Sequence, residues 1–537
     1  MHWPQIRRAL PAPLFFTAVF AVAFLIFFVF QFTTTFADPD SFYHVKMALL
    51  IRDHGIVQDF PWLPFTTLAD SYIDQHLLYH FLLIPFTLVG DPIVGGKLAT
   101  VVLAAGTVTV FAWVLRRLHV WAPALWVAVL LATNPFVFRV SLAKTSALSL
   151  IILFLAFWLL VSYRHRWLLV VSFGYVWTYG GFALLPLIAT VYAVVALVLD
   201  AFRRRRWVPW AWLMGVVNPS SRRSRWFRPL TLQPVRAWGA VLLGTVAGVV
   251  LHPSFPTNLT FYWHQLVQIG IINYRDTIGV GGEWYAYAFL DLLANNVFVT
   301  IALVLGLVLF LIHFRRQTRV STTLLILAVF FFMLTLRSRR FVEYYVPFAM
   351  LFGAYVITLT RPAVDWRSIR QQLRDFTRER RIVTALIVGY LLIAVPTIVV
   401  RDMVSNRRSF EQGFPITKFK SAMTWLRAVS RPGDIVFHSD WDEFPILFYY
   451  NDQNRYIAGL DPTFLYVADP DRYWAWVNVT TGAGVPDLLG TLQQAFGASY
   501  VFLEKDHTAM DALVRAEPKL KLIYEDAEAK IYRVPPP

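Results

Sequence analysis

The sequence predicts a polytopic α-helical membrane protein with a C-terminal α/β domain outside the membrane. Of its 537 residues, 57% are hydrophobic and 15% are charged, a balance that is too apolar for a soluble enzyme. Apolar runs long enough to cross a bilayer recur as far as residue 400, and arginine clusters or polar loops flank them. After residue 401 the composition becomes that of a soluble domain.

The net charge of +16 reflects membrane topology rather than a nucleic-acid surface. The basic clusters all border apolar segments: Arg203–Arg206, Arg222–Arg225, Arg315–Arg316 and Arg378–Arg381. Clusters in this position mark cytoplasmic loops, so we expect contact with membrane lipid and no nucleic-acid partner. The chain has no cysteine, which excludes disulfides, thiolate metal sites and a cysteine nucleophile.

The positions of the arginines orient the predicted spans. Arg7 and Arg8 precede the first apolar run, Leu14–Phe30, which lacks a small-x-small cleavage site and is therefore read as an anchor. We predict about eleven apolar spans: 14–33, 97–115, 119–133, 146–162, 167–182, 183–200, 237–251, 292–314, 321–336, 343–360 and 382–400.

This arrangement gives a transmembrane domain over 1–400 with two long outer loops, 34–96 and 252–290. The apolar stretch Leu77–Val89 is too short to cross, so we expect an interfacial or re-entrant helix within the first loop. With Arg7 and Arg8 inside the cell, the last span places residues 401–537 on the extracytoplasmic side of the cell membrane.

Strand and helix patterns alternate in residues 401–537. Four short alternating runs read as strands: Asp434–Phe437, Arg455–Ala458, Ser499–Leu503 and Ile531–Val534. Three segments read as helices: Ser421–Val429, Val485–Phe496 and Met510–Ala516. The alternation predicts a small α/β domain.

Charged residues follow the first span directly. Asp38, Asp40 and His44 lie within seven residues, where the chain is expected to leave the bilayer. Carboxylates at a membrane surface persist mainly where they bind a cation or handle protons. One of the two aspartates could instead simply cap the next helix.

Further charged residues fall on the same predicted face of the membrane. Arg139 and Lys144 follow the third span, Glu283 lies in the second outer loop, and Arg339 and Arg340 precede the tenth span. The Arg339–Arg340 pair opposes the topology rule, which suggests phosphate binding. Carboxylates suit a hard divalent cation, although a loop glutamate is often only solvated and Arg139 could be an interfacial anchor.

The predicted strand Asp434–Phe437 leads into an acidic loop, Ser439–Pro445, that contains Trp441 and Asp442. Functional loops commonly lie at strand ends. Acids around a tryptophan suit an acceptor's hydroxyl or amide groups, and the alternative is an ordinary acidic surface turn.

These segments resemble the GT-C glycosyltransferases, and within them the catalytic subunit of oligosaccharyltransferase. Asp40–His44 is similar to that family's Asp-Pro-Tyr-Tyr-His segment, whose Asp binds the metal, and Asp38-Pro39 offers a second register. Glu283 stands where the family has a metal and acceptor contact. Arg340–Pro347 resembles an Arg-Phe-x-x-Tyr-x-x-Pro segment that approaches the donor, and Trp441-Asp442 resembles part of a Trp-Trp-Asp-Tyr-Gly motif.

The resemblance covers most of the chain in order, with two departures. Lys144 stands in the region of the family's acidic pair, which puts metal ligation there in doubt. Asp440 replaces the first Trp of the acceptor motif and Glu443-Phe444 replace Tyr-Gly, so recognition of a glycosylation sequon does not carry over.

The resemblance implies an inverting membrane glycosyltransferase with a polyprenyl phosphate or pyrophosphate donor and a protein, glycan or lipid acceptor on the outer face. Asp40, Asp38 and Glu283 would be catalytic or ligate Mg²⁺ or Mn²⁺, while Trp441, Asp442 and His44 would contact the acceptor. Arg340, Arg339, Arg139 and Lys144 would bind the donor phosphate. One alternative is a metal-independent transferase that uses a polyprenyl-phosphate monosaccharide. A lipid-linked sugar transporter or flippase is disfavoured, because the polar residues gather in loops rather than at mid-membrane.

Overall fold

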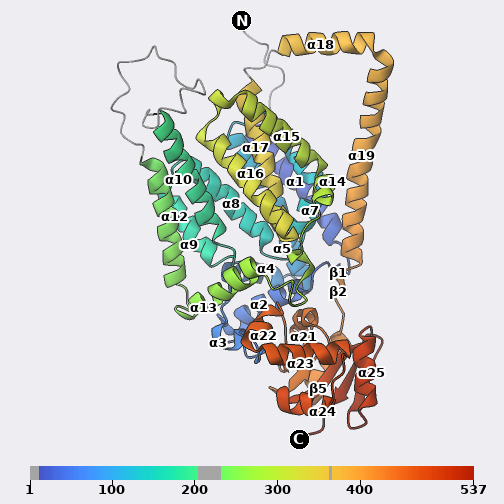
Figure 1. Cartoon of the computed structure of the whole chain (residues 1–537). Coiled ribbons are helices and arrows are strands. Elements are labelled where there is room, and N and C mark those ends of the chain that lie inside the picture. The colour runs from blue at the N-terminus through green and yellow to red at the C-terminus, as the bar shows by residue number, and fades with distance from the viewer. Residues whose placement is uncertain (1–10, 204–231, 362–365) are drawn as a thin grey trace.

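The computed structural model describes residues 11–203, 232–361 and 366–537. Arg7, Arg8 and most residues of the two predicted basic clusters at 203–206 and 222–225 lie outside the described residues. Helices form one body and a small mixed sheet lies at one end of it (Figure 1). The chain is therefore a helical membrane protein with a C-terminal α/β region, as its sequence predicts.

A helix lies at each of the eleven predicted span positions. The helices are α1 (Ala12–Gln31), α5 (Pro92–Arg117), α6 (Pro123–Leu131), α7 (Asn134–Val140), α8 (Ser146–Val161), α9 (His165–Val176), α10 (Leu184–Arg203), α12 (Gln233–Val250), α14 (Phe289–Asn295), α15 (Val297–Ile312), α16 (Arg319–Arg337), α17 (Val342–Thr360) and α19 (Arg381–Glu411). Among the described residues, seven helices are long and apolar enough to cross a membrane, or up to nine if each bent pair counts as one span. The other two predicted spans correspond to the short helices α8 and α9.

Several spans differ from their predicted shapes. The third span bends by 78° between α6 and α7, and α14 meets α15 at 97°. Both bends lie where the chain has Asn-containing breaks, Thr133-Asn134-Pro135 and Asn295-Asn296, because an X-Pro step and short amide side chains favour leaving the helix. Helix α19 continues to Glu411 and stands along one side of the bundle (Figure 1).

The first predicted outer loop is mostly helical. It contains α2 (Asp40–His54), α3 (Leu68–Ser71) and α4 (Leu77–Thr87), the last at the predicted interfacial helix. Helix α2 was expected only in the alternative that an aspartate caps the next helix, because its polar and apolar residues show no simple stripe, yet Phe42, Met47 and Ala48 are fully buried. It packs against α4 on one side and against the C-terminal region on the other, so it buries several faces at once.

The second loop holds α13 (Thr257–Trp263), a π-helical continuation His264–Ile272 and a 3-10 turn Gly282–Trp284. Two more 3-10 turns, Phe314–Arg316 and Arg339–Phe341, flank α16. Helix α18 (Trp366–Glu379) precedes α19 at the end of the molecule opposite the sheet (Figure 1).

The C-terminal region is a five-stranded mixed sheet covered by helices. Its order is β4-β3-β5-β7-β6, with β3 parallel to β4 and β5, and β7 antiparallel to β5 and β6. The strands are β3 (Ile435–Phe437), β4 (Arg455–Tyr456), β5 (Ala498–Glu504), β6 (Lys521–Glu525) and β7 (Ala529–Arg533). Strand β6 was not predicted, because all of its residues are exposed or half exposed and give no clear alternation. The domain division at residue 400 stays a prediction.

The helices of this region are more numerous than predicted. They are α20 (Lys420–Val429), α21 (Phe444–Tyr450), α22 (Thr463–Ala468), α23 (Pro470–Thr481), α24 (Leu488–Gly490) with a π-helical turn Thr491–Ala495, and α25 (Thr508–Ala516), and a 3-10 turn spans Trp441–Glu443. Those predicted at 421–429, 485–496 and 510–516 are present as α20, α24 with its π-turn, and α25.

The segment that follows α1 makes hydrogen bonds with two distant parts of the chain. Strand β1 (Thr35–Phe36) pairs antiparallel with β2 (Phe414–Pro415), which follows α19. From inside the bundle, Lys97 of α5 donates to the carbonyl oxygen of Thr33 at 2.9 Å. These contacts fix the backbone immediately before Asp38.

Candidate active site

Asp38 and Asp40 lie at the N-terminus of α2, where the helix dipole favours negative charge. The Asp40 amide donates to Asp38 Oδ1 at 3.0 Å. Lys144, in the loop between α7 and α8, places Nζ 2.7 Å from Asp38 Oδ2 and 2.9 Å from Asp40 Oδ2. Burial raises the pKa of Asp40 to about 6, although Lys144 opposes the rise. The two carboxylates therefore share one ammonium group.

A second charged group surrounds Glu283, in the turn Gly282–Trp284. Arg139 of α7 donates to Glu283 Oε2 at 2.6 Å and to Glu343 Oε2 of α17 at 2.9 Å. Arg340 donates to Glu283 Oε1 at 3.2 Å. Burial alone would raise the pKa of Glu283, but Arg139, Lys144 and Arg340 together hold that pKa below its ordinary value. Glu283 is thus a permanent carboxylate between cations.

Arg340 is held by aromatic side chains as well as by Glu283. Its guanidinium lies 5.0 Å from the ring centre of Trp284, and it donates to the Tyr179 hydroxyl at 3.1 Å. Arg339 differs, because its side chain is exposed and its Nε donates to the carbonyl of Ala286 at 3.2 Å. Only one member of the predicted arginine pair therefore joins the buried charged group.

Two adjoining cavities bring these groups together. The inner cavity is lined by Asp40, His44, Arg139, Lys144, Glu283 and Arg340, with Glu343 beside them. The wider cavity, with a volume of about 660 Å³, also reaches Asp38, Arg339, Trp441 and Asp442, and this volume lies within the roughly 300–1,000 Å³ of a usual small-molecule site. Every predicted site residue lines at least one of the two cavities.

The C-terminal region forms part of the wall of the wider cavity. Trp441 and Asp442 come from the turn after β3, and Asp461 from the loop before α22. Burial, together with the charges of Asp440 and Glu443, raises the pKa of Asp442 to about 7. Leu460, which lines both cavities, has a φ of 66°. A bulky residue in that conformation is strained, a property that clusters at functional sites.

Sequence reasoning gave no role to several residues of the inner cavity. Glu343 is fully buried, and an acid at the start of an apolar run is a signal that could have found it. Tyr179 receives the Arg340 and Tyr344 hydrogen bonds, but nothing in the sequence marks it. His76 and Gln75 also line this cavity.

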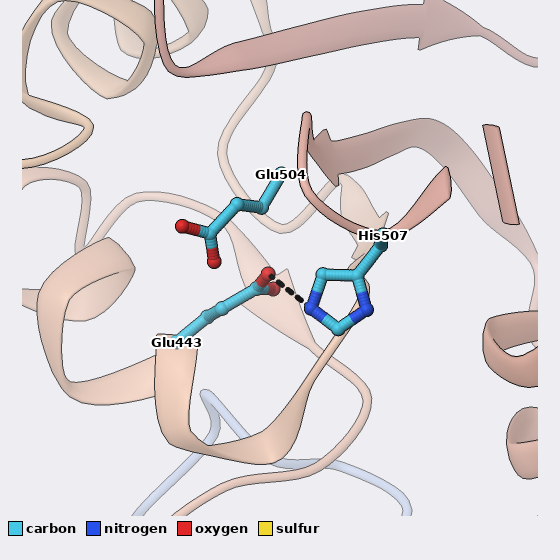
Figure 2. Close-up of side chains that lie close together, drawn as sticks. All are labelled: Glu443, Glu504 and His507. Atoms are coloured by element: carbon cyan, nitrogen blue, oxygen red, sulfur yellow. Dashed lines mark ion pairs between the residues drawn. The ribbon is translucent and has the colours of Figure 1, made fainter. Parts of the chain in front are cut away.

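The predicted metal ligands do not make a compact ligand set. The ammonium group of Lys144 occupies the position between Asp38 and Asp40 that a metal ion would need. Two arginines, Arg139 and Arg340, pair with Glu283. Within the described ranges, the one set of three that could hold a metal is Glu443, Glu504 and His507, beside the sheet (Figure 2). There Glu443 accepts hydrogen bonds from Ser439 and Asp440, and Glu504 pairs with Lys418 at 2.5 Å. Protein donors thus already satisfy both carboxylates.

Neither family models nor curated proteins match this sequence. Solved structures do match the structure of this chain. The archaeal oligosaccharyltransferase AglB from Archaeoglobus fulgidus, in complex with an inhibitory peptide and a dolichol-phosphate, aligns with a TM-score of 0.61 at 13% identity over 98% of this chain and 75% of its own. ArnT from Cupriavidus metallidurans, bound to undecaprenyl phosphate, aligns with a TM-score of 0.54 at 14% identity over 97% of this chain and 98% of its own.

The arabinofuranosyltransferase AftD from Mycobacteria aligns with a TM-score of 0.56 at 12% identity, over 98% of this chain and 40% of the AftD chain. The chain has the GT-C glycosyltransferase fold. Identity this low makes the likeness one of fold. In the GT-C fold of this chain, the charged cavity lies between the helical body and the C-terminal region, and both contribute residues to it.

Proposed function

We propose that this protein is a membrane glycosyltransferase that takes a sugar or oligosaccharide from a polyprenyl phosphate or pyrophosphate donor. The acceptor lies on the outer face of the plasma membrane, beside the extracytoplasmic C-terminal domain. The observation that carries the proposal is the convergence of Asp40, Lys144, Glu283 and Arg340, from four distant segments, on one cavity. The structural neighbours AglB and ArnT, bound to dolichol-phosphate and undecaprenyl phosphate, support a lipid phosphate as the occupant.

In this proposal the cations stabilise the departing phosphate. Arg340 presents a guanidinium, which binds phosphate oxygens in a bidentate manner, and the exposed Arg339 extends the positive charge to the wider cavity. The guanidinium of Arg139 is already engaged by two carboxylates, so it acts by holding Glu283. Charge placed where the leaving group develops its own charge accelerates the departure.

The acceptor binds on the opposite side of the reacting carbon, near Asp40 and the Trp441–Asp442 turn. Attack from that side, in one displacement, inverts the configuration of the sugar. Asp40 orients the acceptor or takes its proton, and either role needs the ionised carboxylate. Asp442 and Trp441 contact the part of the acceptor that lies in the wider cavity.

The position of Lys144 favours the metal-independent form of the reaction. A crystal structure of an Archaeoglobus fulgidus oligosaccharyltransferase contains zinc and sulfate, but here an ammonium group lies within 3 Å of both aspartates. The ammonium group of Lys144 supplies the positive charge that a divalent metal ion would bring.

Transfer is therefore expected to withstand EDTA. In a Lys144→Ser variant, two carboxylates face each other without their shared cation, so transfer should fall and then respond to added Mn²⁺, which prefers oxygen ligands. Incorporation of radiolabelled sugar from membrane-extracted polyprenyl donors measures both effects. Lys46→Ser is the matched control, because Lys46 pairs with Asp452 outside the two cavities at 2.9 Å. Loss of wild-type transfer in EDTA, restored by Mg²⁺, would contradict the metal-independent form.

Binding of undecaprenyl phosphate tests the donor site directly. An Arg340→Ala variant should bind this lipid about 10- to 100-fold more weakly, because it loses a charged hydrogen-bond donor. Glu283 keeps Arg139 as a partner, so the fold should survive. The measurement is native mass spectrometry or fluorescence titration in nanodiscs, with the neighbouring exposed Arg337→Ala as control and undecaprenyl pyrophosphate as a second probe. If the Arg340 and Arg337 variants bound undecaprenyl phosphate with equal affinity, Arg340 would not be a donor-binding residue.

A further inference from the structure

A chain of buried imidazoles lies beside Asp40 and has no role in the reaction described so far. His44 lies one turn along α2 from Asp40 and lines the inner cavity. Its Nδ1 lies 2.9 Å from Nε2 of His80, whose own Nδ1 lies 2.7 Å from Oδ2 of Asp74. Asp74, His80 and His44 are all at least 96% buried, so bulk water does not compete for these hydrogen bonds.

The hydrogen bonds determine which nitrogens carry protons. Burial would raise the pKa of Asp74, but His80 and His76 hold it below its ordinary value, so the carboxylate can only accept. His80 must then donate from Nδ1, and in its neutral form Nε2 of His80 must accept. His44 therefore donates from Nδ1, which leaves Nε2 of His44 without a proton. Among the described residues, the hydrogen bond of the His44 ring is made by Nδ1, and none is made to Nε2.

We propose that Asp74, His80 and His44 form a proton relay that presents the basic Nε2 of His44 to an acceptor hydroxyl in the inner cavity. The inference rests on the proposed glycosyl transfer and names its acceptor class. An Asp-oriented histidine is the arrangement that activates hydroxyl nucleophiles in general. Asp40 then orients the acceptor, while Asp74 and His80 are positioning residues.

The transfer balances in bonds, electrons and protons. The acceptor oxygen forms a bond to the anomeric carbon, and the bond from that carbon to the phosphate oxygen breaks. The leaving polyprenyl phosphate takes the electron pair. The acceptor proton moves to Nε2 of His44, whose Nδ1 keeps its hydrogen bond to the His80 ring that Asp74 orients. The proton passes to solvent when the product leaves.

Other groups around His44 favour its neutral form. Burial lowers the pKa of His44 well below its ordinary value, and His80, His76 and Lys144 lower it further. The titratable groups that face it are Asp40 and Tyr43 on α2, His76, Tyr79 and His80 on or just before α4, and Lys144. His44 therefore remains an unprotonated base at neutral pH.

The test uses diethyl pyrocarbonate, which modifies unprotonated imidazole nitrogens, on the full-length protein in nanodiscs. Peptide mass spectrometry is expected to show modification of His44, with a pH midpoint below that of the exposed His54 on the same helix. In a His80→Leu variant, His44 loses its acceptor and its modification should slow about fivefold, because the other tautomer becomes available. A similar slowing is expected in Asp74→Leu, where only the orienting charge is lost.

Two results would overturn the relay. One is an unmodified His44 under conditions that modify His54, and the other is an unchanged rate in both relay variants. Binding of undecaprenyl phosphate separates this inference from the proposed function, since a His44→Gln variant should bind that lipid within about twofold of wild type, as no phosphate contact is removed. Absence of binding to the wild-type protein would refute the donor assignment, whatever the modification of His44 shows.

Discussion

Replacing Asp40 with alanine is expected to lower sugar transfer at least about 100-fold, because misplacing the acceptor by one ångström can have an effect of that size. The variant also leaves Lys144 with one carboxylate, so its ammonium can move towards the phosphate. Incorporation of radiolabelled sugar from membrane-extracted polyprenyl donors measures the loss. The fold should persist, since Asp38 still pairs with Lys144 at 2.7 Å.

The ionisation of Asp40 predicts that sugar transfer depends on pH. Its pKa is raised to about 6, so Asp40 is ionised above that pH and becomes protonated as the pH falls through it. Wild-type transfer should therefore decline below about pH 6. Asp70→Ala is the matched control, because Asp70 is an exposed acid of the same loop. Full turnover by Asp40→Ala in correctly inserted protein would count against the assigned site.

Replacing Arg139 with methionine is expected to destabilise the protein by about 3–5 kcal/mol, the usual effect of leaving a buried charge without its partner. Glu343 is fully buried, and its second oxygen has no hydrogen-bond partner among the described residues. Without Arg139 this carboxylate would be uncompensated between α17 and the cavity. Denaturation in detergent, followed by tryptophan fluorescence, measures the change.

Two comparisons identify the cause of that destabilisation. A double variant, Arg139→Met with Glu343→Gln, should regain part of the stability, since the unpaired charge is removed. Arg52→Met is the control, because Arg52 pairs with the exposed Asp53 at 2.7 Å, and such surface pairs contribute about 0–1 kcal/mol. Equal effects of the Arg139 and Arg52 replacements would show that the buried network does not carry stability.

The sequence was sufficient to predict the membrane class, the positions of helices at the spans and most charged residues of the cavity, but it gave no role to Glu343. Asp40, Lys144, Glu283 and Arg340 were visible because charge beside apolar runs is costly and therefore informative. Their pairing was not predictable. That Lys144 would lie between Asp38 and Asp40, rather than on a phosphate, depends on how the α7–α8 loop packs against α2.

The residues of the proposed relay show a second limit. Asp74 lies in a polar part of the loop sequence and His80 lies in the apolar stretch Leu77–Val89, and only the fold brings both together, buried beside α2. Helix α2 was itself hidden, because packing on several faces removes the single apolar stripe on which helix prediction depends. Tertiary burial, rather than local propensity, determines this part of the site.

The pairing of β1 with β2 has a consequence for biosynthesis. The strand that fixes the backbone before Asp38 finds its partner only in residues 414–415, and the cavity also needs Trp441 and Asp461. A nascent chain with most of its helices already inserted in the bilayer still lacks these residues. We therefore expect the protein to become competent for the proposed transfer only after residue 461 has left the ribosome.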